Sequence, residues 1–256
     1  THASEKLLTV HKIHVSDETL RVWFQEEHIP YKSRKKRPHR QWRERKAHRG
    51  EMVQMDGSHH DWFEGRGPLC VLMGYVDDAT GTVYARFYEY EGTLPAMDGF
   101  KRYIKLYGLP QSVYLDRHST YKSMAKQSIE EELNDMRPMS HFEKSLAELG
   151  VEVIHAYSPQ AKGRVERLFG TFQDRVVKEM RLAGVTNITE GNAFLDGYLP
   201  EYNRKYAKEA AQKADFHRPV VDKRALDTIL SIKTDRALRN DFTIAHNKKL
   251  YQIKSN

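Results

Sequence analysis

The order of strand-like and helix-like segments predicts an α/β domain built on a mixed five-stranded sheet. Three neighbouring runs rich in β-branched and aromatic residues come first and indicate a meander of strands. A helix, a fourth strand, a helical segment, a fifth strand and a long helix follow. The expected strands are residues 53–58, 69–77, 82–90, 111–116 and 151–156.

A turn motif separates the second and third expected strands. Asp78-Ala79-Thr80-Gly81 supplies the residue types that tight turns favour, so it predicts a hairpin. Asp77 precedes it directly. Because a turn followed by glycine needs no further explanation, we interpret Asp77 and Asp78 as a turn pair outside any functional site.

The helix after the meander has recognisable ends. Thr93 is the expected N-cap, Pro95 lies in the first turn, and Gly108 ends the helix before the fourth strand. Residues 121–150 have a helical and acidic pattern, in which Ser140 begins a capping box for a second helix. An ordinary pair of surface helices is the simplest interpretation of this stretch.

The long helix expected over residues 160–182 carries an apolar stripe with a period of 3.6 residues, which must face the core. The stripe consists of Val165, Phe169, Phe172, Val176 and Met180. Glu166 lies one position away from it.

Two glycines, Gly163 and Gly170, share the helical row of Glu166 and leave the surface around its carboxylate without side chains. A glycine inside a helix costs about 1 kcal/mol relative to alanine, so it needs a reason. Close approach of a ligand or of another backbone is the preferred reason. Packing of the helix against the sheet at the glycines is the alternative.

The flanking segments indicate smaller modules. Residues 5–11 and 15–28 predict two helices, compatible with either a helix-turn-helix or a plain helical hairpin. Further helices are expected over 188–208, capped near Thr189, and over 222–231. Residues 236–253 alternate like strands and suggest the start of a small β module.

Composition points to a polyanionic partner. The formal net charge is +7, and basic residues crowd into residues 32–49, with Glu44 as the only acid there. Few apolar anchors accompany them, so this stretch is either a solvated linker or an arm that contacts nucleic acid, and we favour the arm.

No apolar run reaches the length of a membrane span. The lone Cys70 and the polar start favour a soluble protein of a reducing compartment, and the first residue indicates a piece of a longer chain.

Three acidic residues stand out by their settings. Asp56 lies in the first strand, Asp116 closes the fourth, and Glu166 occupies the glycine-flanked helix. If the fold brings them together, their oxygens suit Mg²⁺ or Mn²⁺, and two such ions can stabilise both ends of an in-line displacement at phosphorus. Taken alone, Asp56 and Asp116 are each more often a turn residue or a helix cap than a metal ligand.

The ordered segments resemble the DDE transposases of the retroviral integrase superfamily, and most closely the bacterial insertion-sequence members. The resemblance covers about residues 52–206, and its motifs are Val53-Gln54-Met55-Asp56-Gly57, Val76-Asp77-Asp78-Ala79-Thr80-Gly81, Tyr114-Leu115-Asp116-Arg117 and Tyr157-Ser158-Pro159-Gln160-Ala161-Lys162-Gly163-Arg164-Val165-Glu166-Arg167. Asp116 and Glu166 are further apart than in many relatives, because the acidic helical pair is inserted between them.

The resemblance implies an RNase H-like fold and metal-dependent cleavage and joining of DNA ends, with Asp56, Asp116 and Glu166 as catalytic metal ligands. It implies Mg²⁺, for which Mn²⁺ can substitute. The expected partners are double-stranded DNA, both transposon ends and target DNA, and at least one further copy of the chain. The expected location is the cytoplasm, in association with the nucleoid, and no membrane is involved. The expected domains are a helical DNA-binding segment (1–31), a basic linker (32–51), the catalytic domain (52–208, insert about 121–150), and a linker with a small β-barrel start (209–256). The expected DNA contacts are Lys35, Lys36, Arg37, Arg40, Arg43, Arg45, Lys46, Lys162, Arg164 and Arg167.

Two other functions use the same features. A nuclease that only hydrolyses DNA would need the same metal cage, but it has little need of a helical module and a basic arm. A DNA-binding regulator with an inactive site is disfavoured because all three carboxylates are present. For the arginines around Glu166, surface salt bridges are the simpler alternative to phosphate contacts.

Overall fold

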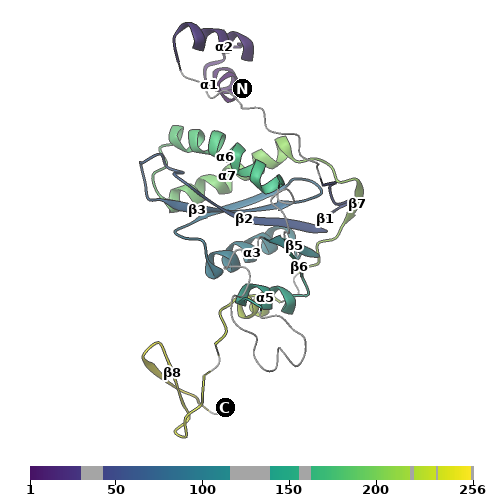
Figure 1. Cartoon of the computed structure of the whole chain (residues 1–256), viewed down its shortest axis with the longest axis vertical. Coiled ribbons are helices and arrows are strands. Elements are labelled where there is room, and N and C mark those ends of the chain that lie inside the picture. Colours follow the sequence, from purple (N-terminus) through teal and green to yellow (C-terminus); the bar gives the residue numbers. More distant parts are fainter. Residues whose placement is uncertain (30–42, 116–138, 156–162, 220–221, 235, 255–256) are drawn as a thin grey trace.

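The computed structural model describes the chain outside residues 30–42, 116–138, 156–162, 220–221, 235 and 255–256 (Figure 1). The helices are α1 (His2–His11), α2 (Asp17–Glu26), α3 (Thr93–Tyr107), α5 (His141–Glu148), α6 (Gly163–Leu182), α7 (Ile188–Tyr206) and α8 (Lys223–Ile229). The strands are β1 (His48–Arg49), β2 (Met52–His60), β3 (Cys70–Asp77), β4 (Val83–Tyr88), β5 (Ser112–Leu115), β6 (Glu152–His155), β7 (Gln212–Asp215), β8 (Thr243–His246) and β9 (Lys249–Gln252).

The predicted mixed five-stranded sheet is confirmed. Its order is β4-β3-β2-β5-β6, with antiparallel pairing among β2, β3 and β4 and parallel pairing of β2 with β5 and of β5 with β6. Helices α6 and α7 cover one face and α3 and α5 the other (Figure 1). Because both faces are covered, every residue of β3 is buried, as expected for a strand in the middle of a two-sided core.

The two faces of the sheet can be assigned from single contacts. The Tyr75 hydroxyl donates to the carbonyl of Ala96 in α3 at 3.1 Å, so odd-numbered residues of β3 face α3. On the other face, a Cβ added at Gly74 would lie 2.9 Å from the ring of Phe169 in α6. The predicted apolar stripe of α6 is buried against this second face.

Helix α7 satisfies the free backbone groups of the edge strand β4. The side-chain amide of Asn192 accepts from the Phe87 N–H at 2.8 Å and donates to its carbonyl at 3.1 Å. Asn203 makes the same pair of bonds with Val83, both at 2.8 Å. An unpaired strand edge invites pairing with another chain, and these two asparagines close this edge.

The element ends agree with the sequence patterns in most places. Ser140 forms the predicted capping box with Glu143, and Gly108 ends α3 with a φ of 98°. Two predicted caps were wrong by one or two residues. Gly92, not Thr93, is the N-cap of α3, and Asn187, not Thr189, caps α7 by accepting from the Glu190 N–H.

A short parallel pair that the sequence patterns did not predict joins β1 to β7. The segment after it also packs on the main domain: Tyr103 and His217 share a hydrogen bond of 2.8 Å, and Leu226 and Leu230 belong to the same buried core as the sheet. The chain beyond residue 208 thus contributes to the core of the main domain before it reaches the β8–β9 hairpin, in which Asn247 and its neighbour have a positive φ.

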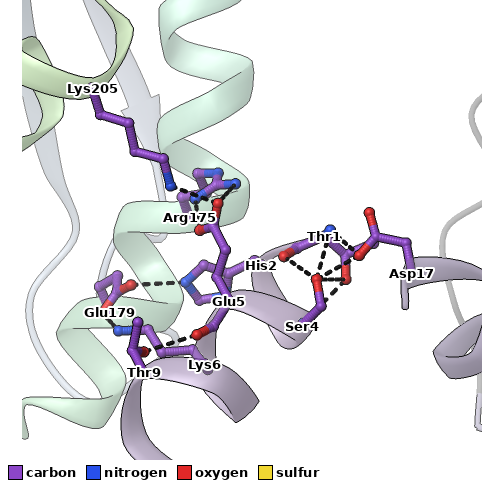
Figure 2. A network of polar contacts seen from close by, with 10 residues as sticks. All are labelled: Thr1, His2, Ser4, Glu5, Lys6, Thr9, Asp17, Arg175, Glu179 and Lys205. Carbon is purple, nitrogen blue, oxygen red and sulfur yellow. Dashed lines mark hydrogen bonds and ion pairs between the residues drawn. The ribbon is translucent and has the colours of Figure 1, made fainter. Parts of the chain in front are cut away.

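Ion pairs hold the N-terminal helix α1 to α6 and α7. No residue of α1 is buried. Glu5 pairs with Arg175 at 2.7 Å and with Lys205 at 2.6 Å, while His2 and Lys6 pair with Glu179 (Figure 2). The hydrogen bond from Arg175 lowers the pKa of Glu5 to about 2, with Lys205 adding to the effect. The carboxylate therefore stays ionised at any physiological pH.

Because ion pairs at a surface weaken as salt screens them, we expect Glu5→Gln to release α1 from the main domain. For this variant at low salt, we expect the deuterium exchange of residues 1–28 to rise toward the exchange of the unchanged chain in about 0.5 M salt. At that concentration the screening length is below ~5 Å, so the ion pairs of the unchanged chain are weakened. Glu18→Gln is the matched control, since Glu18 pairs with Arg21 inside α2. Equal protection in both variants would contradict the docking role of Glu5.

None of the helices in the described part of the chain is long and apolar enough to cross a membrane.

Candidate functional site

Asp56 lies on the face of the sheet that α6 covers. It is the antiparallel partner of Gly74, and directly opposite residues of neighbouring strands point to the same face. Since the position of Gly74 is filled by the ring of Phe169, the half-buried Asp56 belongs to the layer between β2 and α6.

Two hydrogen bonds fix α6 along β2 on either side of Asp56. Two residues before it, Gln54 Oε1 accepts from the backbone N–H of Val165 at 3.3 Å. Two residues after it, Ser58 Oγ accepts from Gln173 Nε2 at 3.3 Å. Asp56 therefore lies beside the first two turns of α6, the part of the helix that contains Glu166.

Glu166 is exposed in the first turn of α6, on the flank that contains Gly163 and Gly170. Gln173 lies seven residues after Glu166 and so on the same flank, and it contacts β2. An added Cβ at Gly163 or Gly170 would meet no described atom within 4 Å. Packing against the sheet, the alternative explanation of these glycines, is therefore wrong as far as the described residues go.

Asp116, the third predicted ligand, lies outside the described residues. Strand β5 leads to it and ends one residue earlier, at Leu115. The parallel register of β5 with β2 pairs Val53 with Val113 and Gln54 with Tyr114. In the described part of the chain no three His, Cys, Asp or Glu side chains gather as a metal site, and the predicted trio is not complete there.

Asp78 is the centre of a buried polar network that the sequence patterns did not reveal. Its side chain is fully buried and accepts from Gln54 Nε2 at 2.7 Å, from Arg164 Nη1 at 2.9 Å, from Arg43, and from the Lys46 N–H at 2.8 Å. A buried carboxylate needs such partners to offset lost hydration. The network joins the end of the basic arm, β2 and the start of α6, and it thereby positions the helix that holds Glu166.

The neighbouring Asp77 has the turn role predicted for it. One of its oxygens accepts from the Thr80 N–H at 2.8 Å and from the Thr80 hydroxyl at 2.7 Å, and the other accepts from the Gly50 N–H at 2.8 Å. The two acids of the pair thus have different structural tasks: Asp77 shapes the hairpin turn, and Asp78 anchors α6. The sequence predicted the turn role of Asp77 but not the anchoring role of Asp78.

The predicted DNA-contacting residues have different surroundings. Lys35, Lys36, Arg37, Arg40 and Lys162 lie outside the described residues. Arg43 and Arg164 pair with Asp78, and burial lowers the pKa of Arg164, an effect that Asp78 opposes. Lys46 pairs with Glu51 at 3.1 Å. Arg45 and Arg167 are exposed and donate to backbone carbonyls. Any role of these residues in binding DNA stays a prediction.

The chain is similar in sequence to two curated transposases. It is 39% identical over 221 residues to the putative transposase y4bF of Sinorhizobium fredii, a match that covers 86% of this chain and 47% of the relative. It is 28% identical over 211 residues to the transposase for insertion sequence IS1202 of Streptococcus pneumoniae, covering 82% of this chain and 44% of the relative. The chain thus spans about half the length of these relatives. No protein-family model matches it.

The fold has a counterpart among solved structures. A chain in the cryo-EM structure of the simian T-cell lymphotropic virus intasome in complex with the PP2A regulatory subunit B56 gamma matches at a TM-score of 0.52 and 19% identity, covering 87% of this chain and 76% of that one. At this identity the likeness shows the fold alone. The resemblance predicted from the motifs is thus confirmed: this chain is similar over most of its length to insertion-sequence transposases, and its core has the RNase H-like fold of the integrase superfamily.

Proposed function

We propose that this chain is the catalytic part of a DDE transposase, a polynucleotidyl transferase that cuts the 3′ ends of a transposon and joins them to target DNA. The observation that supports it best is the placement of Asp56 and Glu166. The sheet holds Asp56 beside the first turns of α6, and Glu166 lies in the first of those turns on the flank that contacts β2.

Asp116 comes directly after strand β5, and β5 is the parallel neighbour of β2, the strand that contains Asp56. Neighbouring strands lie about 5 Å apart. We therefore infer that Asp56 and Asp116 form one side of a cage and Glu166 the other.

These three carboxylates fit divalent metal. Carboxylate oxygens are the ligands that Mg²⁺ prefers, and Mn²⁺ accepts the same set. Glu166 is exposed, and no atom of the described residues packs against Gly163 or Gly170, on either side of it in the helix, which suits a ligand that approaches closely. Asp56, Asp116 and Glu166 would hold the metal, which when bound supplies charge that stabilises the attacking and leaving oxygens.

The protein's own task in this proposal is positioning. Strand β2 fixes Asp56 through the backbone ladder with β3, and the network of Asp78, Gln54 and Arg164 fixes the start of α6. Neither step of the proposed reaction needs a covalent intermediate with the protein. The nucleophile would be water in the first step and the freed 3′-hydroxyl in the second, and both would occupy the same position between the carboxylates.

The test is a strand-joining assay. A labelled duplex that carries the terminal repeats of the element encoding this chain is mixed with the chain, Mg²⁺ and a supercoiled plasmid. We expect label to appear covalently in plasmid DNA. Release of label by hydrolysis without joining would support the nuclease instead, and binding without cleavage would support the regulator.

A further inference from the structure

A hollow of about 290 Å³ lies between α6 and α7, and Glu5 of α1 lines it together with Arg175 of α6 and Lys205 of α7. One oxygen of the Glu5 carboxylate accepts from Arg175 Nη1 at 2.7 Å, and the other accepts from Lys205 Nζ at 2.6 Å (Figure 2). A single carboxylate from the N-terminal helix thus lies between two cations of the main domain.

The two cations are also supported by the main domain itself. The guanidinium carbon of Arg175 lies 5.6 Å from the ring centre of Tyr206, and Lys205 Nζ lies 5.2 Å from it. The negative face of an aromatic ring attracts cations at such distances. Tyr206 packs against Tyr202 with ring centres 4.8 Å apart, and Tyr202 packs edge-on against the buried Phe172 at 5.0 Å. The support of the two cations thus reaches the core, which makes them a preformed site for an anion.

Two further acidic residues line the same hollow, and each has a basic partner. Glu201 pairs with Arg204, one turn later in α7. Glu179 of α6 pairs with His2 at 2.9 Å and with Lys6, both from α1. The contact of α1 is therefore reciprocal: its carboxylate meets two cations, and its basic side chains meet a carboxylate. Complementary charges of this kind fix the register of a contact more than they add to its strength.

The contact of Glu5 is fully charged but exposed to solvent. Its hydrogen bonds raise the pKa of Arg175 and of Lys205, so both cations keep their charge at physiological pH. The side chains of Glu5 and Lys205 are 37% and 53% exposed, and no residue of α1 is buried. Because exposed ion pairs contribute little after screening by solvent, α1 is held by contacts that another anion can replace.

We propose that Arg175 and Lys205 form a binding site for a DNA phosphate, and that Glu5 occupies this site as an internal competitor until DNA displaces α1. Carboxylate and phosphate offer the same kind of acceptor oxygen to guanidinium and ammonium groups. The inference rests on the proposed function only in taking DNA as the anion. Neither cation is among the DNA contacts expected from the sequence, because the site exists only where α6 and α7 meet.

The site is separate from the candidate metal site. Arg175 follows Glu166 by nine residues, about two and a half turns of α6, so the two side chains lie on opposite sides of the helix. Lys205 comes from the last turn of α7. A phosphate bound between the two cations therefore belongs to DNA at a distance from the reacting bond. Such a contact positions the duplex without reading its sequence.

The first experiment measures the affinity for a random-sequence duplex in EDTA at low salt, so that the metal site has no part in the result. Glu5→Gln should bind about fivefold more tightly than Glu18→Gln, because the internal competitor is absent; this is the factor expected for losing one or two exposed ion pairs. Both variants have the same net charge, and Glu18 pairs with Arg21 inside α2. Equal affinity of the two variants would overturn the proposal.

The second experiment tests the cations themselves, because Glu5→Gln also frees the N-terminal helices. Arg175→Gln is added to Glu5→Gln, a background in which α1 is already released. The slope of log affinity against log salt should become less steep by about one, the value for one lost phosphate contact. Arg102→Gln in the same background is the matched control, since Arg102 lies on α3, on the other face of the sheet (Figure 1).

We expect the control to keep the slope of Glu5→Gln, and thermal melting verifies that each variant is folded. The same slope in both double variants would show that the gain in affinity comes from the freed N-terminal helices. That result would overturn the phosphate site.

The third experiment observes the competition directly, as deuterium exchange of residues 2–11 in the unchanged chain at low salt. Addition of the duplex should raise this exchange toward the level of Glu5→Gln. Inorganic phosphate at the same concentration of phosphate groups should leave it nearly unchanged, because single phosphates lack the advantage of linked ones. Unchanged or lower exchange with the duplex would overturn the inference, and an equal rise with inorganic phosphate would overturn DNA as the ligand.

The joining assay keeps this inference apart from the proposed function. If the unchanged chain joins DNA while the duplex fails to displace α1, only the inference is overturned. If the unchanged chain binds DNA and releases α1 but neither cleaves nor joins, only the proposed function is overturned.

Discussion

Replacing Asp56 by asparagine is expected to lower both DNA cleavage and strand joining at least ~10³-fold, because the charge stabilisation that a held metal supplies is worth several kcal/mol and each ~1.4 kcal/mol is a factor of ten. Asparagine has nearly the same shape, and the ladder of β2 with β3 uses only backbone groups. DNA affinity in EDTA should therefore stay within about threefold, since the carboxylate makes no favourable contact with phosphate.

Glu166→Gln should have the same effect for an independent reason. Its side chain is exposed on α6, so its replacement leaves the core unchanged, and melting should occur at the same temperature. Asp61→Asn is the control: Asp61 follows β2 and accepts from the Gly65 N–H in a surface turn. Normal cleavage with Mg²⁺ by either Asp56→Asn or Glu166→Gln would show that the assignment of the metal ligands is wrong.

Asp78→Ala is expected to cost the domain about 3–5 kcal/mol in free energy of unfolding, the usual result of removing one partner of a buried ion pair. Asp78 is fully buried, and the side chain of Arg164 is only 10% exposed. Without the carboxylate, Arg164 and the amide of Gln54 remain buried with no acceptor from Asp78. Urea unfolding measures the loss.

The same substitution should also lower catalysis by about 10²-fold at temperatures where the variant is folded, because small displacements of a catalytic group are costly. Gln54 and Arg164 connect Asp78 to the first turn of α6, which contains Glu166. Asp227→Asn is the control, since Asp227 pairs with Lys101 at the surface and its replacement should leave the urea midpoint nearly unchanged. A loss of under ~1 kcal/mol for Asp78→Ala would contradict the anchoring role.

Local patterns predicted the elements of the core well. The runs of β-branched, aromatic and apolar residues within 53–90 predicted buried strands, and the apolar stripe of α6 predicted its buried side; most of these residues are buried in the structure. Ser140 and Gly108 were predictable because caps and helix ends depend on the conformation of single residues. The motif around Glu166 indicated the resemblance to DDE transposases for a similar reason: its residues are adjacent in the chain and can be recognised without the fold.

Contacts between distant segments were not predictable in this way. Residues 48–49 pair with 212–215, and Glu5 pairs with Arg175. The sequence around each of these residues does not indicate which distant residue it contacts. Asp78 was interpreted as a turn residue because its sequence neighbours form a turn. In its network, the four partners of its side chain, Gln54, Arg164, Arg43 and the Lys46 N–H, all come from outside the turn.

The amino-acid sequence by itself determined the strands and helices of the core, the residue types of the acidic trio and the resemblance to insertion-sequence transposases. Only the tertiary structure decided that Asp56 faces α6 and that Asp78 anchors the helix of Glu166. The physical reason is that hydrophobic periodicity is a property of residues close together in the sequence, whereas the partners of a buried charge depend on which distant groups the folded chain brings together.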